Sequence, residues 1–227
     1  MNKINTLAFA GTVAATMAVQ GFAAASPSLG IVLDNGKPIQ FVHGNATANT
    51  PARAHSPKLH TIYENFANLY PQGVYNASTG AALSGPNTLH GQIWLAASFT
   101  PVKNTTLQEL DVAAGYINGT TNSVSVGLYA DASGVPGTQI WSTNTALPTF
   151  SSCCTVVQLT DQAGVPLTAG TRYWVGITTL SNATDTSAAW NLAVKNQVKP
   201  DLAAQNRGTG WQAGNSVPSF AFGVYGN

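Results

Sequence analysis

Three aromatic residues lie on the more polar faces of predicted strands. Alternation along the chain separates Trp94, Tyr129 and Trp174 from the apolar residues of their own segments. An exposed ring of this kind can stack on the C–H groups of a sugar, so the three rings form a candidate binding platform. Two of the segments also carry glycines, Gly127 and Gly176, and a ring can instead cover a strand glycine. Both interpretations stay open.

Trp211 is a further candidate binding residue. It stands in a Gly-rich stretch, residues 208–214, which is predicted as a loop. A tryptophan on a loop would add a contact beside the platform.

The two cysteines, Cys153 and Cys154, are adjacent. Thiols seldom stay free in an oxidising compartment, so we predict a disulfide between the two neighbours. The bridge would close almost no chain, and its effect on the unfolded-state entropy should be small. Intermolecular disulfides and reduced thiols are the alternatives.

No catalytic constellation is present in the sequence. Glu109 and Asp111 share a strand face and could serve glycoside hydrolysis, although a solvated strand edge is the favoured interpretation. The segment 131–134 could lend oxygens to calcium but is predicted first as a turn. The four histidines follow no metal spacing. We therefore predict no enzyme activity, no catalytic residue, no metal site and no cofactor.

The order of short segments predicts an all-β chain. Runs of four to ten residues with β-branched and aromatic side chains alternate with Gly, Pro and Asn. The expected strands cover residues 61–66, 92–99, 107–116, 123–130, 139–142, 155–159, 172–179, 188–194 and 220–225. The turns expected between them include 118–119, 131–137, 161–166, 182–186 and 208–214. About nine strands suffice for two packed sheets, so we expect an antiparallel β-sandwich of jelly-roll type.

The N-terminus predicts an exported protein of one domain. Lys3 precedes an apolar run from Leu7 to Val19, and small residues then offer cleavage after Ala25 or Ala23. Residues 1–25 are thus the expected signal peptide. Residues 26–58 are expected to form an extended arm or linker, and a short strand of it at 31–33 or 39–42 could dock on the domain. The β-sandwich domain is expected at 59–227.

Composition excludes some partners. Charged residues make up 7% of the chain, against about 25% in an ordinary soluble domain. Loss of Lys3 with the leader leaves eight basic and eight acidic residues. Neither nucleic acid nor an anionic membrane surface suits a chain without a basic patch. No segment after the leader is apolar enough to span a membrane. Because few charges repel neighbouring copies, self-association of the chain is a further expectation.

Three motifs of the body resemble the choice-of-anchor type domains of exported bacterial proteins. They are the segments 96–101, 124–137 and 167–175, and Tyr63-Glu64-Asn65-Phe66 is similar to the opening strand of that unit. The resemblance covers about residues 60–225. It implies a jelly-roll-type sandwich on a surface or secreted protein and supplies no catalytic residue.

We expect a secreted protein, extracellular or periplasmic, that binds carbohydrate without catalysis. A structural, self-assembling surface protein is the second function class, favoured by low charge and the paired cysteines. A hydrolase is the third.

Overall fold

The computed structural model describes residues 39–45, 47–48, 59–67, 74–153, 155–194, 202–214 and 219–227. This part of the chain forms strands and no helix, which confirms the all-β class, and so it holds no helix that could cross a membrane. The strands are β1 (Phe41–His43), β2 (Thr47–Ala48), β3 (His60–Glu64), β4 (Asn76–Ser84), β5 (Trp94–Phe99), β6 (Thr105–Val112), β7 (Ala114–Asn118), β8 (Val124–Asp131), β9 (Pro136–Thr145), β10 (Ser152–Cys153), β11 (Val157–Leu167), β12 (Tyr173–Thr179), β13 (Ser187–Leu192), β14 (Ala203–Asn206), β15 (Trp211–Gly214) and β16 (Phe222–Gly226).

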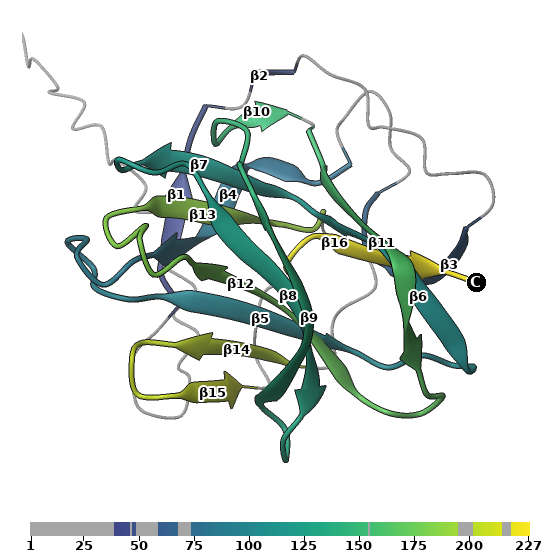
Figure 1. Cartoon of the computed structure of the whole chain (residues 1–227). Helices are drawn as coiled ribbons and strands as arrows, with labels where there is room; N and C mark the ends of the chain where they lie inside the picture. Colours follow the sequence, from purple (N-terminus) through teal and green to yellow (C-terminus); the bar gives the residue numbers. More distant parts are fainter. Residues whose placement is uncertain are drawn as a thin grey trace, which may run out of the picture.

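The strands form a sandwich-like arrangement (Figure 1). One layer is an antiparallel sheet of six strands in the order β15-β14-β5-β12-β8-β9. The other layer contains two antiparallel sheets, β1-β4-β13-β7 and β11-β6-β16-β3. Ala113 joins these two sheets, because it alone separates β6 from β7 and its backbone bonds to Ala221 and Asn191.

The main core lies between the layers. The six-stranded sheet contributes buried residues such as Leu95, Val126 and Val175, and the opposite layer contributes Trp190 and Phe222. Their positions follow the alternation of apolar and polar residues along each strand. For β5, β8 and β12 the sequence pattern therefore identified the face that is turned toward the main core.

Two segments predicted as turns contain strands instead. Residues 161–166 lie within β11, because pairing with β6 stops after Thr160 and resumes at Val165 beyond a bulge. Residues 211–214 form β15, and the turn before it occupies only 207–210, where Gly208 and Gly210 adopt positive φ.

β4 was missed because its residues are small rather than β-branched. It lies between β1 and β13 in its sheet. A Cβ added at Gly80 would meet the Cβ of Ala189 at 2.9 Å. Close approach to β13 therefore selects Gly and Ala here over the residues that ordinarily favour strands.

Part of the predicted arm docks on the body. Phe41, Val42 and His43 pair with β4, and Ile39 is buried in the main core. The expected signal peptide at 1–25, the alternative strand at 31–33 and residues 49–58 lie outside the described residues.

Cys153 ends the short strand β10, which pairs in parallel with β2. The Tyr75 hydroxyl contacts the carbonyl oxygens of Ser152, at 3.3 Å, and Thr155, at 3.0 Å, on either side of the cysteine pair. Cys154 lies outside the described residues, so the predicted bridge between the two cysteines stays a prediction.

Candidate functional site

The candidate site is the outer face of the six-stranded sheet, the face turned away from the main core. Trp174 pairs directly with Tyr129 on one neighbouring strand and with Ser98 on the other. Directly paired residues share a face, so the structure confirms that the predicted aromatic side chains lie on the same side. Trp94 belongs to this face through its alternation with Leu95.

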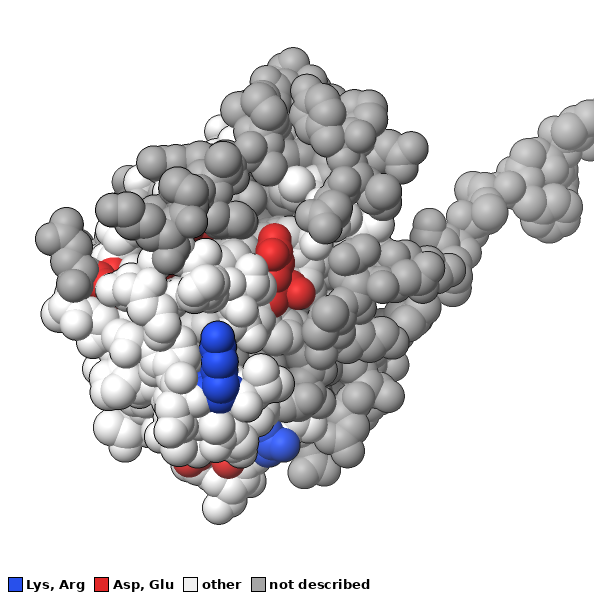
Figure 2. Space-filling model, turned by 90° about the vertical axis from the view of Figure 1, so that its right-hand side faces the viewer, with Lys and Arg blue, Asp and Glu red and all other residues white. Residues whose placement is uncertain are grey.

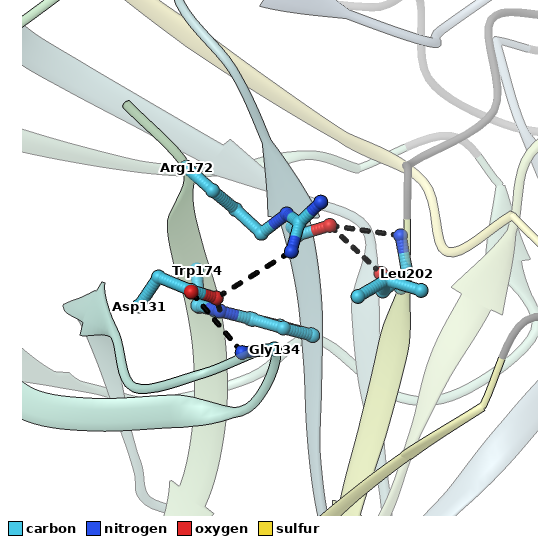
Figure 3. Close-up of polar contacts among 6 residues, drawn as sticks. Asp131, Gly134, Arg172, Trp174 and Leu202 are labelled. Atoms are coloured by element: carbon cyan, nitrogen blue, oxygen red, sulfur yellow. Dashed lines mark hydrogen bonds and ion pairs between the residues drawn. The ribbon is translucent and has the colours of Figure 1, made fainter. Parts of the chain in front are cut away.

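Trp174 is fully buried on this face. Its indole N–H donates to an Asp131 carboxylate oxygen at 2.8 Å, and the other oxygen accepts from the backbone N–H of Gly134 at 3.1 Å (Figure 3). Arg172 lies 3.8 Å from the same carboxylate. Asp131 thus stabilises the turn between β8 and β9, in agreement with the turn predicted at this residue. It also fixes the orientation of the Trp174 ring. No open ring face remains for stacking.

Tyr129 is also buried, and its ring covers strand glycines. A Cβ added at Gly176 would meet the ring at 2.7 Å, and one added at Gly127 would meet it at 3.3 Å. Burial raises the pKa of the Tyr129 hydroxyl, while a hydrogen bond with Thr178 acts in the opposite direction. For Tyr129 and Trp174 the observed packing matches the interpretation of rings that cover small strand residues.

A row of small residues runs across five strands beneath the rings. Each member pairs directly with the next, from β15 to β8, in the order Ala213, Ala204, Ala96, Gly176 and Gly127. Part of this row could be predicted from the sequence, because Ala96, Gly127 and Gly176 each lie two residues from an aromatic residue and so on the same face of its strand.

Trp211 reaches over this row from the edge strand. It lies on β15 rather than on a loop, and its ring centroid is 6.2 Å from that of Tyr129. Trp211 is on β15 and Tyr129 is on β8, and three other strands lie between these two, so their backbones are about 19 Å apart in a flat sheet. The two side chains therefore extend toward each other across the sheet. Trp211 remains partly exposed.

Trp94 is the second partly exposed ring. Its indole N–H donates to the Thr179 hydroxyl at 3.0 Å, which fixes the orientation of the ring. Asn206 pairs directly with both Trp94 and Trp211, so the three residues form one cross-strand row.

Asn206 and Gln92 add amide groups beside the rings, and neither residue was singled out from the sequence. The Asn206 side-chain oxygen accepts from Gln92 at 3.2 Å, from Gly208 N–H at 2.8 Å and from Gly210 N–H at 3.3 Å. Within the described part of the chain, Asn206 Nδ2 and Gln92 Oε1 have no hydrogen-bond partner. Asn206 in the row therefore offers an oriented donor, and Gln92 beside the row offers an acceptor.

Glu109 and Asp111 are not on a solvated edge. β6 lies between β11 and β16, and each of the two residues is only 3% exposed. They share a face with Tyr225, which pairs with Glu109. Burial, with the negative charges of Glu64, Asp111 and Glu109, raises the pKa of the Tyr225 hydroxyl. The favoured interpretation of an exposed edge was wrong because the neighbouring strands could not be identified from sequence.

Among the residues that the structure describes, no three His, Cys, Asp or Glu side chains are grouped to hold a metal ion. Comparison with protein-family models, curated proteins and solved structures found no match. The resemblance to choice-of-anchor domains stays a prediction.

Proposed function

We propose that this protein is an exported, non-catalytic carbohydrate-binding module, with its ligand on the row Trp94–Asn206–Trp211 and the adjacent Gln92. The observation that carries the proposal is that two partly exposed tryptophans flank one amide in a single cross-strand row. Of the other two predicted residues, Tyr129 contacts the Trp211 ring, and both Tyr129 and Trp174 are buried on the same face.

The ring surfaces supply the apolar part of recognition. The indole N–H of Trp94 is already bonded within the protein, so that residue offers ring surface rather than a donor. Because its ring is fixed before a ligand arrives, little side-chain entropy is lost on binding.

The amides supply the polar part. The hydrogen bond between the two side chains keeps the amides of Asn206 and Gln92 side by side, and among the described residues each amide retains one unbonded group, Asn206 Nδ2 and Gln92 Oε1. A donor next to an acceptor matches neighbouring hydroxyl groups of a sugar, each of which both donates and accepts. All four side chains are uncharged, which favours a neutral sugar.

The remaining parts of the proposal rest on the sequence. Export depends on the leader at residues 1–25 and suits a ligand outside the cell. Antiparallel neighbours that are not consecutive in the chain, β5, β12 and β8, support a jelly-roll connectivity.

A glycan array of the mature chain, residues 26–227, tests the function. We expect binding to neutral glycans, and loss of that binding in Trp94→Ala and in Trp211→Ala. Leu89→Ala is the matched control, because Leu89 is an almost fully exposed apolar residue outside the row. An array without ligands, or ligands that both tryptophan variants still bind, would overturn the proposal.

A further inference from the structure

Most edges of the three larger sheets carry features that oppose pairing with another chain. β1 and β15 are three and four residues long. β11 contains Asp161, Pro166 and a bulge, and β3 begins at His60 and ends at Glu64. β7 is covered by a parallel bridge from Tyr116 to Thr149.

β9 is the exception among these edges. It spans ten residues and, within the described part of the chain, it pairs with β8 alone. Register shifts interrupt its first half, where Ile140 remains 43% exposed, but Trp141–Thr145 pairs without interruption. No residue of β9 is charged, and its only proline is the first residue, Pro136.

The surroundings add little charge. Asp131 is the only charged residue between Val124 and Thr149, and its carboxylate is occupied by Trp174, Gly134 and Arg172. Charge is sparse elsewhere too: on the face shown in Figure 2, which is the right-hand side of Figure 1, charged side chains of the described residues are few and scattered. Two copies of this edge can therefore approach each other without like-charge repulsion.

The geometry of an antiparallel edge is complementary to itself. Along Trp141–Thr145, every second residue directs its N–H and C=O away from β8. A copy related by a two-fold axis presents the same groups in the opposite direction, so the two edges can exchange hydrogen bonds.

From these observations we propose that the regular half of β9 pairs with β9 of a second copy of this chain, which joins the two six-stranded sheets across a two-fold axis. Exposed Ile140 lies at the end of the shared ladder and adds apolar contact. The proposal concerns a different edge from Trp211 on β15, so it does not depend on carbohydrate binding.

Sedimentation equilibrium of the mature chain over a range of micromolar concentrations tests the pairing. We expect a reversible dimer. The double variant Ile140→Lys, Asn144→Lys places charges at two exposed positions of the edge and should weaken the dimer at least about tenfold. The double variant Leu89→Lys, Val102→Lys adds the same two charges at exposed apolar positions outside β9 and should leave the dimer unchanged.

Two further measurements keep the outcome specific. Amides at alternate positions of Trp141–Thr145 should exchange more slowly in the wild-type dimer than in the double variant. Dimerisation should also persist in Cys153→Ser, Cys154→Ser, because β-pairing needs no disulfide. A monomer at every concentration, a dimer indifferent to the lysines of β9, or one lost with the cysteines would overturn the proposal.

Discussion

At the scale of single residues, Trp174 is the most constrained ring of the outer face. It is fully buried and its N–H is bonded to Asp131. We therefore expect Trp174→Ala to lower the free energy of unfolding by about 3–5 kcal/mol, since it removes a large buried side chain and leaves a carboxylate without its donor. Urea unfolding followed by circular dichroism measures this loss.

Trp94→Ala is the matched comparison. Trp94 lies on the same face but is partly exposed, so its truncation should cost clearly less than that of Trp174. Equal losses at the two positions would mean that Trp94 is a packing residue and would weaken its assignment to the ligand row.

Tyr75 gives a pH-dependent prediction. Burial raises its pKa from 10.0 to about 12, so the folded state holds the phenolic proton more tightly than the unfolded state does. Its contribution to stability is fully present below about pH 10 and is lost as the pH rises from 10 to 12. Tyr75→Phe should be less stable at neutral pH, because the carbonyls of Ser152 and Thr155 lose a donor.

The difference between Tyr75→Phe and the wild type should then shrink between pH 10 and 12. Urea titrations at several alkaline pH values measure it. Tyr129 and Tyr225, whose pKa values are also raised, are present in both proteins and so contribute equally. A difference that stays constant or grows with pH would contradict the assignment.

Much of the site could be predicted at this scale, but its exposure could not. Alternation alone placed Trp94, Tyr129 and Trp174 on the more polar face of their own strands, because side chains alternate along a strand. That the three faces form one surface follows only from the pairing of β5, β12 and β8. Whether each ring is exposed depends on its neighbours across the sheet, and Asp131 reaches Trp174 from β8. Asn206 was missed because its relation to both tryptophans exists only after β14 and β15 pair with β5.

At the scale of the elements, the ring of Tyr129 on β8 lies over Gly176 on the paired strand β12. An added Cβ at Gly176 meets the ring at 2.7 Å, so Gly176→Ala forces the ring to move. We expect a loss of about 1–3 kcal/mol in the free energy of unfolding. Chemical denaturation measures it.

A double-mutant cycle supplies the control. In a Tyr129→Ala background the ring is absent, and Gly176→Ala should cost little or even stabilise the strand, since glycine is unfavourable there. If the two changes add without coupling, the ring does not limit the space at Gly176.

Element boundaries show where sequence patterns fail. Strands with alternating apolar residues, such as β8 and β12, were predicted nearly to their observed ends. β4 and β14 were missed because Ala, Gly and Ser carry little strand preference, although both have strands on each side in their sheets. β11 was cut short because its bulge contains the residues that usually mark a turn.

At the scale of the whole molecule, the two layers share a core that extends to the N-terminal segment. Ile39 is buried in the main cluster, and β1 adds an edge strand beside β4. The predicted domain start near residue 59 followed from the loss of apolar periodicity before it. The sequence analysis also allowed a short strand at 39–42 to dock on the domain, and β1 with Ile39 confirms it. Periodicity could not assign so few residues to the domain, because their position depends on the surface on which they pack.

The last prediction concerns this segment. We expect Ile39→Ala to lower the free energy of unfolding by about 2–5 kcal/mol, because the residue fills part of the main core. Asn45→Ala, at an exposed position of the same segment, should change it by less than about 0.5 kcal/mol. A chain that begins at Leu59 should lose at least as much stability as Ile39→Ala, since it lacks both the side chain and the strand beside β4. Thermal and urea unfolding of the three variants measure these changes in the free energy of unfolding. A truncated chain as stable as the mature protein would show that residues before 59 serve only as a linker.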